Sequence, residues 1–172
     1  GAGLDRDECV RPDSSVESLA RLRPVFRAEG GSVTAGNSSP MNDGAAALLL
    51  ASEAGLALTG RVPLARVVAR AVSGIEPHLY GLGPVEASRR ALVRAGIGWG
   101  DLVAVELNEA FAAQSLACLA ELPDLDPGIV NVNGGAIAMG HPLGATGAMI
   151  LGTVLDELER RDLNTALVPL CA

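Results

Sequence analysis

The chain lacks lysine altogether and has very few aromatic residues, and both shortages limit what it can be. All 13 basic residues among its 172 are arginines, against 20 acidic residues, so the formal net charge is −7 at pH 7. An acidic surface repels polyanions, which argues against nucleic acid or an anionic membrane as the main partner. Aromatic residues make up 2% and apolar residues 49%, so alanine, valine and leucine must fill the core. Such small side chains suit closely stacked layers of helix and sheet.

Cysteine is also scarce, and the three that occur, Cys9, Cys118 and Cys171, show no metal-ligand spacing. We therefore expect no metal site, and free thiols are the ordinary state of such residues in the cytosol. We interpret Cys9 and Cys118 as small buried apolar side chains. The sequence does not open with a signal-peptide pattern, and its apolar stretches are short and interrupted. These observations predict a cytoplasmic protein without membrane spans.

Strand and helix patterns alternate along the second half of the chain, which is typical of the α/β class. Apolar, β-favouring segments predict strands at 63–73, 102–107, 129–132 and 165–170. Capping residues and apolar periodicity predict helices at 16–22, 52–58, 84–95, 109–121 and 145–161. The run 45–51 is continuously apolar, and periodicity fits either a buried strand or a buried helix there.

Two of the expected helices lead to further predictions. The helix at 109–121 is apolar almost all round, so we expect it to be buried between layers. The last helix has one apolar stripe, and its pairs Asp156/Arg160 and Glu157/Arg161 stand four residues apart. We expect both pairs to form on the solvent-exposed face.

Three polar residues, Asn108, His141 and Cys171, end strands or stand at strand-to-helix turns. Because ligands of open α/β sheets bind beyond the carboxyl ends of the strands, we expect these side chains to meet at one edge. An imidazole with an amide can hold an oxyanion or enolate, and a thiol can transfer a proton. Each residue alone also has a structural explanation, as a histidine in a glycine loop, a helix N-cap or a small apolar side chain. We interpret His78, beside Pro77, as a solvated turn residue.

The joint pattern is more specific than its parts. The segment Asn108-Glu-Ala-Phe111 is followed by Gly134-Gly135, by Gly140-His-Pro-Leu-Gly-Ala-Thr-Gly147 and by a strand that ends in Cys171. Upstream stand Thr34-Ala-Gly-Asn-Ser-Ser39 and Asn42-Asp-Gly-Ala-Ala-Ala47. Over essentially its whole length, the chain resembles the thiolase family.

Thiolases interconvert a 3-ketoacyl-CoA plus CoA with acetyl-CoA plus a shortened acyl-CoA, and the resemblance implies that activity. It also implies a layered αβαβα sandwich of two similar α/β halves, here mainly the C-terminal half. Residues 1–58 would be the end of a loop region with the last strand and helix of the N-terminal half, and residues 59–172 the C-terminal half. Coenzyme A thioesters would be the partners, with no further cofactor, and the complete protein would be a homo-oligomer, a dimer or tetramer.

The resemblance also implies roles for the residues that match the family's motifs. His141 would help to activate a nucleophilic cysteine and bind the thioester oxygen, Asn108 would hold a water at that oxyanion site, and Cys171 would exchange a proton with the acetyl α-carbon. The substrate-binding positions would be Ser39, Tyr80, Phe111 and Gly140. Ser39 falls near a serine that contacts the pantetheine of CoA. Tyr80 stands where the family often has methionine, so it would either reshape the acyl pocket or only pack its loop.

One part of the family's active site has no counterpart in this sequence. The nucleophilic cysteine of the family lies in a Cys-small-Ser-Gly motif, and neither Cys9 nor Cys118 has such neighbours. The glycine-rich segment that follows the acid/base cysteine in the family is also missing, because only Ala172 follows Cys171 here. We therefore interpret the chain as the C-terminal portion of a thiolase and expect it to be catalytically silent alone. Its apolar run 45–51 would then be an unpaired edge in this chain, because the strands that pair with it would lie in the absent half.

Two other functions fit parts of the pattern. A non-catalytic acyl-CoA-binding or lipid-binding module, or an assembly subunit, would keep the fold but would be free to lose Asn108, His141 and Cys171. A ketoacyl synthase shares the fold, but its two-histidine pattern differs from the spacing here, which ends in a cysteine. Neither the acyl chain length nor the biosynthetic or degradative direction follows from the residues.

Overall fold

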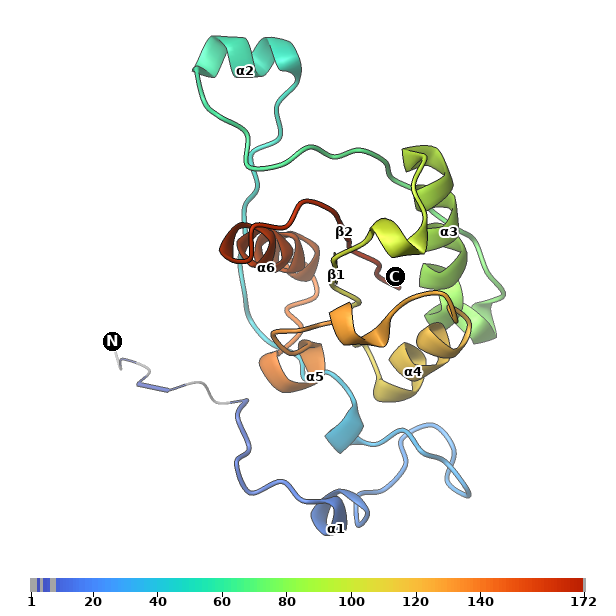
Figure 1. Ribbon diagram of the computed structural model, residues 1–172. Helices are drawn as coiled ribbons and strands as arrows, with labels where there is room; N and C mark the ends of the chain where they lie inside the picture. The colour runs from blue at the N-terminus through green and yellow to red at the C-terminus, as the bar shows by residue number, and fades with distance from the viewer. Residues whose placement is uncertain (1–2, 4, 7–8, 172) are drawn as a thin grey trace.

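The computed structural model describes residue 3, residues 5–6 and residues 9–171 (Figure 1). In chain order, the described part forms α1 (Val16–Leu19), η1 (Ala35–Asn37), α2 (Glu53–Thr59), η2 (Pro77–Leu82), α3 (Gly83–Ala95), η3 (Trp99–Asp101), β1 (Ala104–Val105), α4 (Ala112–Ala120), η4 (Pro127–Ile129), α5 (Ala136–Met139), α6 (Thr146–Arg160) and β2 (Ala166–Leu167). The η elements are 3₁₀ helices. None of the described helices is both long and apolar enough to cross a membrane.

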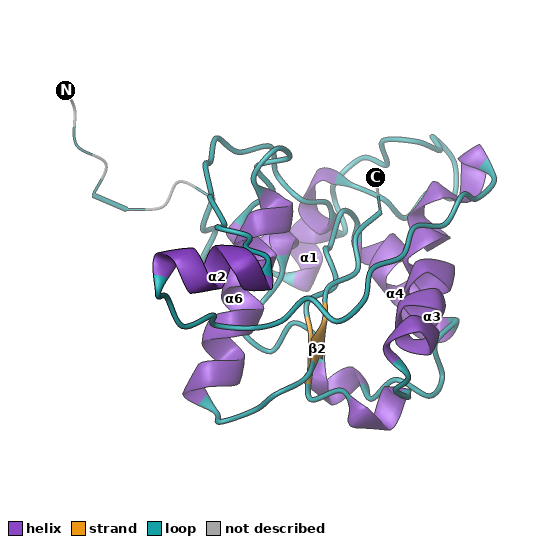
Figure 2. Cartoon of the chain, turned by 90° about the horizontal axis from the view of Figure 1, so that it is seen from above, coloured by secondary structure: helices purple, strands orange, loops and turns teal. Residues whose placement is uncertain are grey.

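Two short parallel strands, β1 and β2, form the centre of the folded part. Ala104 pairs with Ala166, and Val105 pairs with Leu167. Figures 1 and 2 show α6 on one side of these strands and α3 with α4 on the other. The layered α/β arrangement predicted from the sequence is therefore present, although the strands are shorter than the apolar segments that predict them.

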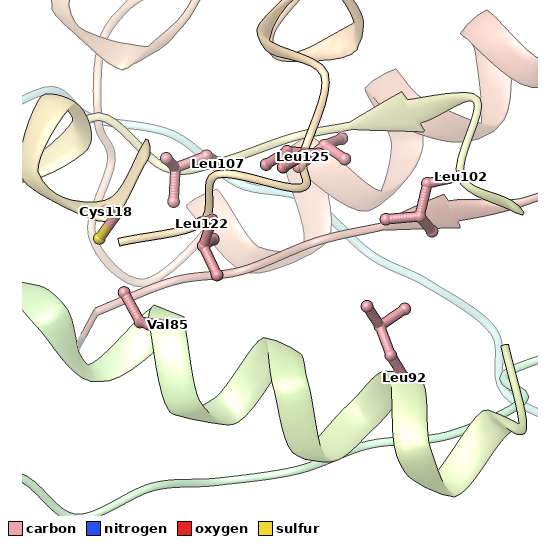
Figure 3. Close-up of a cluster of buried hydrophobic side chains, with 8 residues drawn as sticks. Val85, Leu92, Leu102, Leu107, Cys118, Leu122 and Leu125 are labelled. Atoms are coloured by element: carbon pink, nitrogen blue, oxygen red, sulfur yellow. The ribbon is translucent and has the colours of Figure 1, made fainter. Parts of the chain in front are cut away.

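The apolar core fills the space between the strands and the helices α3 and α4 (Figure 3). Its buried side chains are Val85, Leu92, Leu102, Val105, Leu107, Cys118, Leu122 and Leu125. Figure 3 shows Val85 and Leu92 pointing from α3 toward the strands. Cys118 is fully buried, which confirms its interpretation as a small apolar side chain. Cys9 is only half-buried, and its sulfur lies 2.7 Å from the side-chain nitrogen of Asn42.

Local capping sets the ends of several helices, as predicted from the sequence. The Ser15 and Ser52 hydroxyls accept hydrogen bonds from backbone N–H groups at the starts of α1 and α2. Gly60 and Gly96 end α2 and α3 in the left-handed conformation, which glycine adopts without steric penalty. Helix α3 and helix α6 lie within about one residue of their predicted bounds, because their signals are local.

The strand predicted at 63–73 is not formed, and this prediction is wrong for the structure. The segment runs as largely exposed, irregular chain, since no neighbouring strand in the described part offers it hydrogen bonds. Arg90 and Arg94 of α3 donate to two of its carbonyl groups instead. The run 45–51 is neither strand nor helix and is exposed throughout. Figure 1 shows α2, which joins these two segments, standing away from the rest of the fold.

Helix α4 differs from the prediction in its start and in its burial. It begins after Phe111, which occupies the N-cap position, and Asn108 is therefore not its cap. Gln114 and Cys118 of this helix are buried, but Leu116 is 66% exposed. Within the described chain, α4 is therefore covered on one face and open on the other.

The strand predicted at 129–132 is reduced to a single parallel bridge between Val105 and Val130. Asn131 has φ 50°, a left-handed conformation that takes the chain out of the extended path. A strand cannot continue through such a residue, and the chain turns here toward the glycine loop.

Of the two ion pairs predicted for α6, the one between Glu157 and Arg161 is formed and the one between Asp156 and Arg160 is not. Glu157 is buried, not exposed, and both Arg160 and Arg161 donate to its carboxylate. Hydrogen bonds from Asn133, Arg160 and Arg161 lower the pKa of Glu157 to about 2. Arg160 therefore pairs with Glu157 and not with Asp156, and the carboxylate ties α6 to the segment before the glycine loop.

Candidate functional site

The carboxyl ends of β1 and β2 present two of the candidate residues at one edge of the sheet. Backbone pairing continues past the strands, because Glu106 N donates to Leu167 O at 3.0 Å and Asn108 N donates to Pro169 O at 3.1 Å. Asn108 and Cys171 therefore leave the sheet at the same end, on adjacent segments. The structure brings these two residues to one edge in the way the strand pattern predicts.

The Asn108 side chain is buried, with 2% of the residue exposed. Among the described residues, neither its Nδ2 nor its Oδ1 has a hydrogen-bond partner. Leaving a buried amide unpaired costs roughly 1–3 kcal/mol per group, so native structures keep few of them. A fixed donor and acceptor in this state are suited to bind a ligand oxygen or a water molecule.

Asn131 fixes the segment that precedes Asn108, a role that was not predicted from the sequence. Its Nδ2 donates to Leu107 O and its Oδ1 accepts from Leu107 N, both at 2.8 Å. The side chain of Asn131 thus pairs with Leu107 as a neighbouring strand would. The available signal was an asparagine directly after an apolar strand, a residue that tolerates positive φ.

His141 is held both at its main chain and at its ring. Its backbone N–H donates to Asn42 Oδ1 at 2.9 Å and lies 3.3 Å from Pro40 O. Its ring Nδ1 lies 2.7 Å from the Thr146 hydroxyl, which in turn lies 3.0 Å from Pro142 O. Asn42 and Thr146 are therefore parts of the site that were not predicted, although both stand in the quoted motifs. Among the described residues, the second ring nitrogen, Nε2, makes no hydrogen bond.

One short segment, 38–42, joins the turn after β1 to the histidine loop. The backbone N–H and the hydroxyl of Ser39 both donate to Ala110 O at 3.1 Å. Met41 forms a parallel bridge with His141. The turn after β1, which contains Ala110, and the loop that contains His141 are therefore both attached to segment 38–42. Ser39 lies directly against the first of these two motif turns.

Phe111 and Gly140, two further predicted residues, have clear local contacts. The Phe111 ring meets Phe26 edge to face, with centroids 5.6 Å apart and an interplanar angle of 79°. Gly140 has φ 103°, and a Cβ there would lie 2.6 Å from Asn42 Oδ1. Gly140 therefore lets Asn42 approach the backbone of His141, which no larger residue would allow.

Tyr80 lies on η2, which packs against α3 and α4, and its side chain is 47% exposed. The next residue, Gly81, accepts a hydrogen bond from the Cys118 thiol at 3.2 Å. A Cβ on Gly81 would lie 2.8 Å from Gln114 Cγ. These contacts attach the loop of Tyr80 to α4. His78, on the same 3₁₀ helix, is exposed, which confirms its interpretation as a solvated residue.

Glu109, the neighbour of Asn108, supports the glycine loop. Its Oε2 accepts a hydrogen bond from Ile137 N at 3.2 Å, in the short helix α5. A Cβ on Gly135 would lie 2.2 Å from the Glu109 Cδ. Gly135 therefore leaves room for this carboxylate, and the two motifs interlock at this contact.

Burial sets the protonation states near the sheet edge. Desolvation by burial, together with the smaller effects of the charges on Glu157 and Glu109, raises the pKa of Glu106 to about 7. Burial raises the pKa of the Cys171 thiol, opposed in part by a backbone hydrogen bond. Cys171 is therefore a protonated thiol at neutral pH, which suits a proton donor better than a nucleophile.

The outer face of α4 is bordered by a hollow of about 330 Å³. Its lining residues include Glu109, Leu116, Leu119, Asn131 and Gly135.

Nowhere in the described part of the chain do three or more His, Cys, Asp or Glu side chains gather to hold a metal ion.

Two segments of the chain match known protein-family models. Residues 61–172 match the family model described as "Thiolase, C-terminal domain", and residues 2–54 match "Thiolase, N-terminal domain". The chain belongs to the thiolase family. The resemblance read from its motifs is thereby confirmed.

Individual thiolases agree with this assignment. The chain is 52% identical over 168 residues to an acetyl-CoA acetyltransferase of Rhizobium meliloti, covering 98% of itself and 42% of that protein. It is 51% identical over 170 residues to a 3-ketoacyl-CoA thiolase of Photorhabdus laumondii, covering 98% of itself and 44% of the relative. The chain thus spans less than half the length of these thiolases.

Solved thiolase structures confirm the fold. The crystal structure of the Bacillus anthracis acetyl-CoA acetyltransferase matches with a TM-score of 0.90 and 47% identity, over 97% of this chain and 42% of that one. The human mitochondrial 3-ketoacyl-CoA thiolase in complex with CoA matches with a TM-score of 0.84 and 42% identity, over 96% and 41% of the two chains. The expected α/β thiolase fold is therefore present over nearly the whole chain.

Proposed function

We propose that this chain supplies the oxyanion-binding and acid/base residues of a thiolase that cleaves 3-ketoacyl-CoA with CoA or runs the reverse Claisen condensation. The observation that supports this most directly is the buried Asn108 amide. Its donor and acceptor are unpaired among the described residues, and it lies at the same sheet end as Cys171. A protein that used this edge only for packing would gain stability by pairing or replacing that amide.

In the proposed thiolysis, a cysteine nucleophile attacks the 3-keto carbonyl and the bond between the α- and β-carbons breaks. The electron pair forms the enolate of acetyl-CoA, whose oxygen is held by His141 and by a water on Asn108. The Cys171 thiol gives its proton to the α-carbon, and acetyl-CoA leaves. The Cys171 thiolate then takes the proton of an incoming CoA thiol, which attacks the acyl-enzyme and releases the shortened acyl-CoA.

The nucleophile of this scheme lies outside the 172 residues. The sequence contains no Cys-small-Ser-Gly motif, and the raised pKa of Cys171 makes its thiol a poor attacking group. We therefore propose that the chain is silent alone and acts as part of a longer thiolase. In that protein, residues 1–58 would close the N-terminal half and residues 59–172 would form most of the C-terminal half.

The substrates of the proposed reaction are CoA thioesters, in keeping with the names of the relatives and with the CoA complex of one of them. Ser39, Phe111 and Gly140 would contact the thioester arm, since they surround the two motif turns. Tyr80 would act on the acyl group or pack its loop. We further propose a cytoplasmic homo-oligomer for the complete protein.

A grafted enzyme tests this proposal. The residues of the Rhizobium meliloti acetyl-CoA acetyltransferase that align with this chain are replaced by it, and thiolysis of acetoacetyl-CoA is measured. We expect an active graft in which Cys171→Ser and His141→Ala each lower kcat by roughly 10²-fold or more, and Asn108→Ala lowers it by about 10-fold or more.

His78→Ala is the matched control, because it removes an exposed histidine from the same chain. It should leave kcat unchanged. If the graft binds CoA thioesters but Cys171→Ser costs no activity, the chain is a non-catalytic acyl-CoA-binding module and the proposal is wrong.

A further inference from the structure

We infer that Thr146 is a positioning residue that holds His141 in its Nδ1–H tautomer, so that the unprotonated Nε2 meets the reactants as a proton acceptor. This inference rests on the proposed function, because that function gives Nε2 its use. The decisive contact is between the Thr146 hydroxyl and the His141 Nδ1, at 2.7 Å.

The donor in this contact follows from the other bond of Thr146. The hydroxyl has one hydrogen, and it lies 3.0 Å from Pro142 O, four residues earlier in the chain. Donation to the carbonyl at i−4 is the usual bond of a threonine in a helix. Once that hydrogen is used, only lone pairs of the hydroxyl face the ring, so Nδ1 must carry the proton.

Burial makes this arrangement selective. Thr146 is 3% exposed, so water does not replace the hydroxyl as the partner of Nδ1. The Pro142 carbonyl also accepts from Ala145 N at 2.7 Å and Thr146 N at 2.9 Å, which fixes its position. The competing arrangement turns the hydroxyl toward Nδ1 and gives the Nε2–H tautomer. The two arrangements differ in one observable, the nitrogen that bears the proton.

The two tautomers differ in their chemistry. With Nδ1 protonated, Nε2 accepts the proton of an attacking thiol, and the imidazolium then donates a hydrogen bond from Nε2–H to a developing oxyanion. The proton returns to the cysteine sulfur when the acyl-enzyme is cleaved. With Nε2 protonated, the ring cannot act as that base. The backbone bond from His141 to Asn42 Oδ1 fixes the base of the side chain, so Thr146 has only to select the proton position.

The tautomer is measured directly by two-dimensional ¹⁵N–¹H NMR of the imidazole rings in the ¹⁵N-labelled 172-residue chain. The chain has two histidines, and the exposed His78 is an internal reference. Spectra are recorded at about pH 9, so that neutral imidazole rings are observed. We expect His141 to show a protonated Nδ1 and an unprotonated Nε2, and His78 to show mainly the Nε2–H form that an unrestrained histidine side chain prefers in water.

Two variants separate positioning from a general structural role. Thr146→Val keeps the shape but removes the hydroxyl, and should exchange the protonated and unprotonated nitrogens of His141. Thr146→Ser keeps the hydroxyl and should retain the wild-type pattern. A His141 pattern like that of His78 in the wild type, or an unchanged Nδ1–H form in Thr146→Val, would overturn the inference. Because the readout needs no turnover, it is independent of whether the grafted enzyme is active.

Discussion

The Cys171 thiol illustrates how burial at a single residue affects the chemistry of its side chain. Its pKa is raised because the side chain, beyond the end of β2, is partly removed from water. The proton is therefore retained at neutral pH and is available for transfer, whereas a nucleophilic cysteine needs the opposite shift. The same residue in an electropositive pocket would be a candidate nucleophile, so its surroundings, not its identity, decide the role.

Alkylation of Cys171 tests this assignment. Since only the thiolate reacts, we expect iodoacetamide to modify Cys171 more slowly than glutathione at neutral pH, with a rate that still rises where the glutathione rate has levelled off. Peptide mass spectrometry gives the rate for this residue alone. In urea the difference should disappear. A folded-state rate equal to or above that of glutathione at neutral pH would contradict the acid/base role.

Glu106 offers a second prediction at the residue scale, in stability. Its pKa is about 7 in the folded chain, against an ordinary value of 4.5. The folded state therefore binds more protons than the unfolded state between these values, and the free energy of unfolding falls as pH rises through this window. Glu106→Gln removes the titration. It should raise the free energy of unfolding at about pH 8 by on the order of 1–3 kcal/mol, with little gain at about pH 4.

Urea unfolding of both proteins at the two pH values measures this effect. Glu159→Gln is the control, because it removes an exposed carboxylate of α6 and should change neither value by more than roughly 0.5 kcal/mol. A Glu106→Gln gain of equal size at both pH values would show that charge is not the cause.

At the scale of elements, the sequence predicts those parts of the structure that local chemistry determines. Ser52 and Gly60 define both ends of α2, and they do so without help from the rest of the chain. The segments 45–51 and 63–73 are different, because a strand exists only with a neighbour to accept its hydrogen bonds. Their apolar composition is compatible with buried strands, but the structure gives them no partner strand in the described part.

The candidate site likewise contains residues that local sequence predicts and residues that depend on distant contacts. Asn108, His141 and Cys171 were predicted because they stand at strand ends and in recognisable motifs. Asn42 and Asn131 were not, because each acts through contacts with chain 99 or 24 residues away. Position in the sequence gives no indication of which backbone group a distant amide will reach.

The exposed apolar segments predict how the isolated chain behaves. Leu49 is 86% exposed and Val68 is 68% exposed, and exposed apolar side chains promote association. The double variant Leu49→Ser, Val68→Ser should reduce self-association in light scattering and lower binding of the dye ANS. It should leave the Tm nearly unchanged, because neither side chain is packed.

Leu92→Ser is the comparison, since Leu92 is 5% exposed and part of the core. It should destabilise the chain by roughly 3 kcal/mol or more. If the double variant lowers the Tm as much as Leu92→Ser does, the two segments are packed against something and are not open edges.

At the scale of the whole molecule, the chain is less than half of the thiolases that it matches. It covers 42% of the Rhizobium meliloti relative and of the Bacillus anthracis structure. Among the described residues, its open features include the two apolar segments, the outer face of α4 and the amide of Asn108, which has no hydrogen-bond partner there. In the division of roles proposed above, the remaining part of a thiolase would cover or use these features.

The most direct test of that division is to locate the acetyl group after the grafted enzyme is incubated with acetyl-CoA and digested for mass spectrometry. The account predicts one acetylated cysteine, in the part contributed by the Rhizobium meliloti enzyme, and no acetyl group on the 172-residue chain, whether grafted or alone. Acetylation of Cys171, Cys118 or Cys9 at a comparable yield would contradict it, because the chain would then contain its own nucleophile.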